Sequence, residues 1–361
     1  MSKNKKKKKV RRANPETLAK VRLGLSTLIS NDACIRTGRE WKGALTIIPI
    51  TLALASVVLA ILPTFVSRMN VQGSAIAFSA PVALYDQGLA DFTSDLIYDI
   101  EGNPRETPIE LKIENGTFSL SDKATLCAGN AWYTVNRAST GTTAFEVFFN
   151  DTPLADDVFY TNLNAYKTPE GEPRDPDGKK TTPQASFLAF GKNSIRFLKK
   201  TDLSTNNIVA LTGSYQLLNG TDFTAFAKTI KDADGNPLKP YQAAYVEKIR
   251  AFYTDVINKS YEPAKVAGTW QYTGIFAGID LGLILLFGLI TFLMTRGKKN
   301  PFRIYTFWET QKMAYWASLT PAVLSMALGF WLTQYAFIFF MFTYGMRMMW
   351  MSMKSMRPVQ Q

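Results

Sequence analysis

Long apolar runs near both ends of the chain enclose a polar middle. Positions 43–67 carry no charge, and the stretch 44–66 is long enough to cross about 30 Å of hydrocarbon as a helix. We interpret it as a retained anchor rather than a cleaved signal peptide, because 43 residues precede it. Three further apolar runs follow at 268–294, 314–333 and 335–353. We therefore expect four transmembrane helices, the last two forming a tight hairpin.

The polar segment between the first two apolar runs, 67–267, has a different pattern. Short stretches of alternating apolar and polar residues predict β-strands in its first half. The expected strands are 109–113, 117–120, 132–136, 145–149, 187–190, 194–198 and 208–211. Asn115-Gly116 supplies the residues of a two-residue hairpin turn. Amphipathic helices are predicted at 222–231 and 240–257, and 169–183 is expected to be a mobile polar loop.

An amphipathic helix is also predicted before the first apolar run. Asn14, Pro15 and Glu16 form a typical helix start, with a capping side chain, a proline at the first position and an early acid. Apolar residues then recur at spacings of three and four, flanked by two cations. The apolar residues are Leu18, Val21, Leu25, Leu28 and Ile29, and the cations are Lys20 and Arg22. We expect this helix to lie on a membrane surface or to pack against residues 295–313.

The distribution of charge predicts the orientation. The chain has a net charge of +12, yet residues 68–267 carry 20 basic and 24 acidic side chains. Residues 1–67 carry 13 Lys or Arg against 3 acids. By the positive-inside rule, both termini and the basic loop are cytoplasmic and the large segment is extracytoplasmic. The expected parts are a disordered tail 1–13, a helix and linker 14–43, spans at 44–66 and 268–294, an external domain 67–267, a cytoplasmic loop 295–313, two spans within 314–353 and a tail 354–361.

Together these patterns predict an α+β integral membrane protein. A β-rich extracytoplasmic domain is inserted between the first and second of four transmembrane helices. Cys34 is expected inside and Cys127 outside, so they cannot pair within one chain. An external domain without a disulfide is consistent with the cell membrane of a Gram-positive bacterium.

The N-terminal tail is strongly basic, with eight Lys or Arg among the first twelve residues. We interpret it as a solvated tail that assists topology, or as a contact for anionic lipids of the inner leaflet. The candidate lipid-contacting residues are Lys5, Lys6, Lys7, Lys8, Lys9, Arg11 and Arg12. We do not expect a nucleic-acid partner, because no recognition module accompanies the tail.

The amino-acid composition argues against most classes of enzyme. The chain has no histidine, so it lacks the commonest general base and zinc ligand. Two cysteines are too few for a thiolate zinc site or an iron–sulfur cluster. No P-loop or dinucleotide-binding motif occurs. We expect no catalytic residue, no metal and no cofactor, and hence a protein that is not an enzyme.

Two polar residues lie inside predicted spans. Asp280 and Arg347 fall at similar depths, and a charge in hydrocarbon costs several kcal/mol unless it is paired or wetted. We predict that they form a buried pair. One alternative is a proton or ion relay; another is that Arg347 extends to the cytoplasmic interface while Asp280 bonds a Thr or Tyr. Gly274, Gly278 and Gly282 form a small-residue stripe that permits close helix packing. Its partner is a helix of the same bundle or a helix of another protein.

The order of parts resembles a family of uncharacterised bacterial membrane proteins often encoded beside maltodextrin transporters. The likeness rests on the lead LSTLISNDACIRTGREWKGAL, on PIELKIENGTFSL and SFLAFGKNSIRFL, and on three closely spaced C-terminal spans. It implies an accessory or regulatory role near carbohydrate uptake, with subunits of an ABC transporter as candidate partners. The family provides no catalytic residues to transfer.

Three functions follow as hypotheses. The first is a non-enzymatic polytopic membrane protein that serves as accessory or regulatory partner of a membrane complex. The second is a small transporter or channel subunit that uses Asp280 and Arg347. The third is an extracytoplasmic sensor of glycan or lipid.

Overall fold

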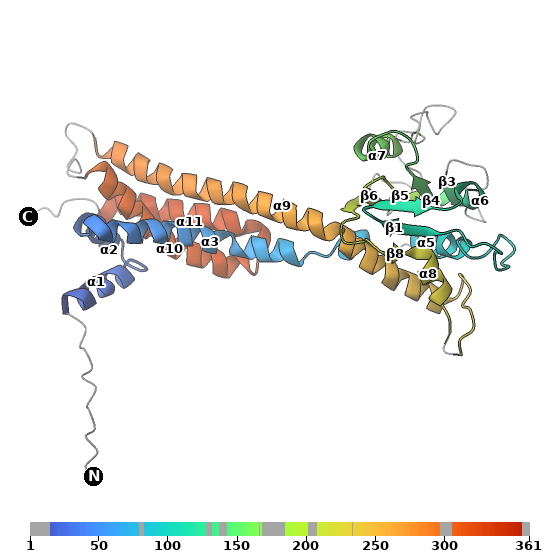
Figure 1. The fold of residues 1–361 in the computed structure, drawn as a ribbon. Helices are drawn as coiled ribbons and strands as arrows, with labels where there is room; N and C mark the ends of the chain where they lie inside the picture. Colours follow the sequence, from blue (N-terminus) through green and yellow to red (C-terminus); the bar gives the residue numbers. More distant parts are fainter. Residues whose placement is uncertain are drawn as a thin grey trace, which may run out of the picture. The chain divides into compact units, whose positions relative to one another are not determined.

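The computed structural model of the protein describes residues 15–78, 83–127, 132–136, 143–165, 167, 185–200, 208–232, 234–296 and 305–355. This part of the chain is α+β, with eleven α-helices and two sheets (Figure 1). The chain divides into two compact units, Val71–Ala267 and Met1–Asn70 with Gly268–Gln361. Each unit has its own apolar core. The predicted lipid-contacting tail and the predicted loop 169–183 lie outside the described residues.

The unit Val71–Ala267 is built around a five-stranded sheet of order β3-β4-β5-β6-β7. Its strands are β3 (Trp132–Asn136), β4 (Thr143–Phe149), β5 (Ser186–Phe190), β6 (Ser194–Lys200) and β7 (Ile208–Ser214). β4 and β5 pair in parallel and the other neighbours are antiparallel. The structure confirms all five strands that the alternating pattern predicts here.

Helices cover both faces of this sheet (Figure 1). Because strand side chains alternate between faces, Phe148 and Phe187 form one cluster with Phe159 of α7 (Asp156–Asn164). Phe149 and Phe190 point to the other face, where their cluster includes α5 (Ala83–Asp95) and the first part of the long helix α9 (Ala243–Met294). The strands are therefore apolar on both sides, as expected for a sheet buried between two layers.

A second sheet of three short strands has the order β2-β1-β8. β1 (Leu111–Glu114) and β2 (Thr117–Leu120) form the predicted hairpin, and β8 is Thr221–Asp222. Asn115 and Gly116 have φ angles of 53° and 75°, the left-handed values that a type I′ turn requires. Asp222 accepts a hydrogen bond from the backbone of Ala225 and so caps α8 (Phe223–Thr229), the first of the two helices predicted for this segment.

Four helices of this unit were not expected from the sequence: α4 (Gly73–Ala77), α5, α6 (Lys123–Leu126) and α7. The signal for α5 is present nevertheless. Tyr85, Leu89, Phe92 and Leu96 recur at spacings of four, three and four, and all are fully buried. That spacing places them on one face of a helix.

The other unit is a helical bundle centred on α10 (Phe307–Gly329). Its remaining members are α1 (Pro15–Ser26), α2 (Asn31–Glu40), α3 (Ile47–Asn70), α11 (Ala336–Trp350) and the end of α9. Helix α10 (Phe307–Gly329) begins with a capping box formed by Thr306 and Glu309, and it packs against α2, α3 and α11. Residues 310–318 of α10 are all buried, although several are polar.

Two described helices, α3 and α9, are long and apolar enough to cross a membrane. The predicted span 268–294 is the second half of α9, and the predicted helix 240–257 runs into it without a break. The third and fourth predicted spans correspond to α10 and α11. Helix α11 itself has 15 residues, which extend about 22 Å at 1.5 Å per residue, and a π-helical turn, Met351–Ser355, continues it by five residues.

One carboxylate joins α7 to the turn between β5 and β6. Asp156 accepts hydrogen bonds from the backbone of Lys192 at 2.6 Å and Asn193 at 3.0 Å, and from the hydroxyl of Ser194 at 2.7 Å. Burial alone would raise the pKa of Asp156, yet these bonds and one from Asn150 hold it below its usual value. Asp156 is thus a structural group, held in its ionised form.

Candidate functional site

Arg347, on α11, connects three helices of the bundle. Its Nε donates to the side-chain oxygen of Asn31 at 3.1 Å, and Nη1 donates to the carbonyl of Ala317 at 3.0 Å. Nη2 donates to the carbonyl of Thr27 and lies 3.5 Å from the sulfur of Cys34. One guanidinium therefore joins α11, α10 and the connection between α1 and α2.

The predicted pair of Asp280 with Arg347 does not form. Asp280 is fully buried, and neither of its carboxylate oxygens has a hydrogen-bond partner among the described residues. Similar depth along two helices does not bring two side chains together, because each must also point the same way around its helix. Oxygen atoms of Thr27 and Asn31, in the turn between α1 and α2, accept hydrogen bonds from Arg347 instead. They fill the role of partner that was predicted for Asp280.

The glycine stripe of α9 is open. A Cβ atom added to Gly274, Gly278 or Gly282 would meet nothing within 4 Å. The expectation that these glycines pack against a helix of the same bundle is therefore wrong for the described residues. Asp280 and Ile284 of the same helix are buried, so α9 uses a different face for packing within the chain. The alternative partner, a helix of another protein, stays a prediction.

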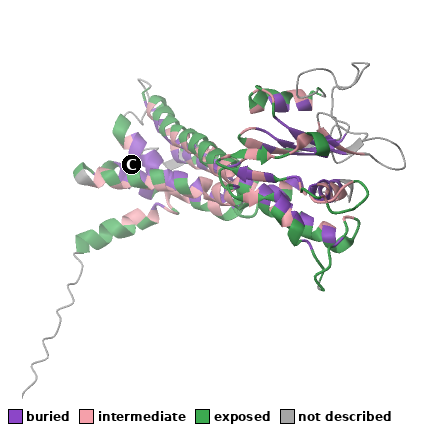
Figure 2. Ribbon diagram, turned by 45° about the vertical axis from the view of Figure 1, so that its right-hand side comes forward, coloured by how far each residue is buried: buried purple, intermediate pink, exposed green. Residues whose placement is uncertain are grey.

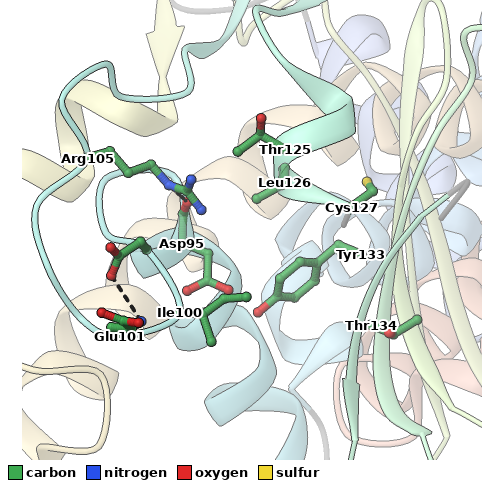
Figure 3. A pocket seen from close by; sticks show the side chains of 10 residues that line it. Asp95, Ile100, Glu101, Arg105, Thr125, Leu126, Cys127, Tyr133 and Thr134 are labelled. Atoms are coloured by element: carbon green, nitrogen blue, oxygen red, sulfur yellow. Dashed lines mark hydrogen bonds between the residues drawn. The ribbon is translucent and has the colours of Figure 1, made fainter. Parts of the chain in front are cut away.

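The second candidate site is a cavity of about 500 Å³ in the β-rich unit (Figure 3). The end of α5, the following loop, α6 and β3 surround it. Its lining residues are Asp95, Asp99, Ile100, Glu101, Arg105, Thr125, Leu126, Cys127, Tyr133 and Thr134. In Figure 3 the side chains of Asp95 and Tyr133 point toward each other. The volume suits a small organic ligand.

Local backbone bonds fix the loop after α5. Asp99 accepts hydrogen bonds from the backbone of Glu101 at 3.0 Å and of Asn103 at 2.8 Å, which closes a turn. The Nε of Arg105 donates to the carbonyl of Asp95 at 3.0 Å. The guanidinium is thereby held beside the last turn of α5.

The carboxyl of Asp95 is the chemically distinctive group of the cavity. Burial raises its pKa to about 6, although a hydrogen bond with the hydroxyl of Tyr133 and the charge of Arg105 act in the opposite direction. Near neutral pH this carboxyl can therefore accept a hydrogen bond, and at mildly acidic pH it can donate one. Asp95, Tyr133 and Arg105 together offer an acid, a phenol and a cation to a polar ligand.

The cavity does not offer a nucleophile. Burial raises the pKa of Cys127 to about 11, so the sulfur is a thiol at neutral pH rather than a reactive thiolate. Among the described residues, no group of three or more His, Cys, Asp or Glu side chains could hold a metal ion.

Comparison with models of protein families, with curated proteins and with solved structures finds no match for this chain. The cavity itself could not have been found from the sequence. Its acid, its cation and its phenol come from a helix end, a loop and a strand that only the fold brings together, and no motif spacing links them.

Replacing Arg347 by Gln should loosen the connection between α1 and α2 and expose Cys34, which is fully buried. Losing one charge-assisted hydrogen bond costs roughly 1.5–3 kcal/mol, so maleimide labelling of Cys34 should become at least about tenfold faster. Mass spectrometry of the labelled protein in detergent measures this, with Cys127 as internal reference. Exposed Arg22 on α1 provides the control, as Arg22→Gln. Equal labelling of both variants would contradict the role given to Arg347.

Replacing Asp95 by Asn should change how stability depends on pH. The pKa of Asp95 is raised in the fold from 3.8 to about 6, so its ionisation opposes folding. The cost is absent below pH 3.8, grows through the window up to about pH 6 and is complete above it, at roughly 2–3 kcal/mol. Asp95→Asn should remove this cost and be more stable than the parent at pH 8. Unfolding in denaturant at several pH values measures it, and the exposed Glu106→Gln should follow the parent.

Proposed function

We propose that this chain is a non-enzymatic membrane protein that serves as an accessory or regulatory partner of a membrane complex. Its β-rich unit binds a small polar ligand and acts as the sensor. The observation that carries the proposal is the cavity of about 500 Å³, in which Asp95, Arg105 and Tyr133 converge without a nucleophile or a metal cluster among the described residues.

The membrane part of the proposal starts from α3 and α9, which enter and leave the β-rich unit and have the length and composition of spanning helices. We extend this to the four-span arrangement, with α10 and α11 as a hairpin. Both termini are then cytoplasmic and the β-rich unit is extracytoplasmic in a bacterial cell membrane, since the excess of basic residues flanks the apolar runs. The ligand would thus be an extracytoplasmic molecule.

The proposed ligand is a saccharide. Side chains such as Asp95 and Arg105 bind vicinal hydroxyls through paired donors and acceptors, and the ring of Tyr133 offers an apolar face. The resemblance to proteins encoded beside maltodextrin transporters suggests the same class of ligand and an ABC transporter as partner.

The alternative function, a transporter or channel subunit, is not supported by the contacts of Asp280 and Arg347. It required Asp280 and Arg347 to act together, and Arg347 is instead bonded to Asn31, Thr27 and Ala317. We therefore favour a protein that acts by binding.

Ligand binding is tested by thermal unfolding of the full chain in detergent with and without maltotriose. A ligand at 100 times its Kd stabilises the folded state by about 2.7 kcal/mol, which should raise Tm by several degrees. Arg105→Gln and Tyr133→Phe should reduce the shift, whereas Glu106→Gln, at the exposed position that follows Arg105 in the sequence, should keep it. No shift with maltotriose, other oligosaccharides or glycerophosphoglycerol would contradict the sensor role.

The accessory role is tested by purifying the tagged chain from its own cells in mild detergent. We expect permease subunits of a carbohydrate ABC transporter to co-purify. The open glycine face of α9 gives a matched variant, because Gly278→Ile adds bulk where the chain itself has no contact. Loss of the subunits with Gly278→Ile and their retention with Ile284→Val, on a buried face, would support contact through the glycines. Purification of the chain alone would contradict the accessory role.

A further inference from the structure

Helix α1 combines a fixed end with an uncovered apolar surface. No residue of α1 is buried, and Figure 2 shows it as exposed along most of its length. The apolar side chains that face away from the chain are Leu18, Val21, Leu25 and the adjoining Ile29, with exposed fractions of 57%, 53%, 64% and 94%. We call these four residues the α1 stripe. Four large apolar side chains in one row are an unusual surface to leave in water.

The C-terminal end of α1 is held against the bundle. The carbonyl of Thr27 accepts from Arg347, and that of Leu28 accepts from the hydroxyl of Thr320. A Cβ atom added to Gly24 would lie 3.5 Å from rings of both Trp41 and Trp316, so this side of α1 faces the bundle. Since Gly24 and the α1 stripe lie on different sides of the helix, docking fixes the stripe pointing outward.

The charges beside the α1 stripe are positive. Arg22 is exposed and lies next to the stripe around the helix, whereas Lys20 lies about 100° around the helix from Val21, on another side. The acid of this helix, Glu16, lies 2.8 Å from Lys20. Eight of the twelve residues at the N-terminus of the chain are also Lys or Arg. A row of apolar residues bordered by cations complements a lipid surface with negative head groups.

Other occupants fit this surface less well. A second copy of the chain would bring its own cations against Arg22 and the basic N-terminus, and like charges repel. No described segment of the same chain covers the α1 stripe. A lipid surface satisfies both the apolar side chains and the charges at once.

We propose that α1 binds the surface of an anionic bilayer through the α1 stripe, with Arg22 at the phospholipid head groups. Arg347 and Thr320 hold the helix in the orientation that this contact requires. This inference is independent of the ligand proposed for the cavity, since it rests on the other unit.

The test uses the full chain in nanodiscs of phosphatidylcholine alone or mixed with phosphatidylglycerol. In a Cys34→Ser, Cys127→Ala background, an NBD fluorophore is attached at Val21→Cys on the stripe or at Ala19→Cys, a matched exposed position on another side of α1. We expect iodide to quench the Val21 label much less in anionic discs than in neutral ones, and the Ala19 label equally in both. Each basic residue near such a surface contributes about 1 kcal/mol, so Arg22→Gln should lower the ratio of bound to free α1 about fivefold, and Lys20→Gln should change it much less.

Three results would overturn the proposal. Quenching of the Val21 label that is as strong as that of the Ala19 label in both lipids would show that the stripe stays in water. Equal protection in neutral and anionic discs would remove the role of charge. Protection of the Val21 label from iodide in anionic discs without quenching by a doxyl-labelled lipid would show that protein, either this chain or a second copy, covers the stripe.

Discussion

A guanidinium placed among apolar side chains must find acceptors, because an unpaired buried charge costs several kcal/mol. Arg347 finds them in Thr27 and Asn31 near the N-terminus and in Ala317 of α10. This single group ties segments more than 300 positions apart in the sequence. It contributes to the placement of α2, to the burial of Cys34 and to the outward direction of the α1 stripe, together with the packing of α2 against α10 and the bond from Thr320 to Leu28.

The same residue shows how far the sequence could predict the bundle. The position of Arg347 within its apolar run predicted how deep it lies in the fourth span. From that depth we correctly concluded that its guanidinium needs a partner inside the bundle. The sequence could not show that the connection between α1 and α2 lies beside Arg347. Helix α2 is polar, and its packing against α10 cannot be predicted from its own sequence. The acid expected as partner, Asp280, was chosen by charge, whereas main-chain carbonyls satisfy the arginine equally well.

Prediction was better where one local rule decides the structure. Strands such as β2 and β3 have the predicted bounds because alternation is a period-2 property, and Asn115-Gly116 forms a turn that few other dipeptides form so readily. Helix α5 was missed although its apolar spacing is helical, since a β-rich neighbourhood was expected. The cavity beside α5 lay beyond prediction altogether, because it depends on the contact of α5 with β3 and on the course of a loop.

The bonds of Asp156 have a consequence for how the β-rich unit folds. This residue begins α7, in the connection between the parallel strands β4 and β5, yet it closes the turn that follows β5. In a crossover of this kind, the chain loses the conformational entropy of a long loop before the contacts between its two strands form. The carboxylate of Asp156 belongs to α7 and bonds the turn between β5 and β6. The hairpin of β5 and β6 therefore stabilises the docked position of α7, and α7 stabilises the turn of that hairpin. We expect the crossover and the hairpin to form in one cooperative step, with few partly assembled species along the way.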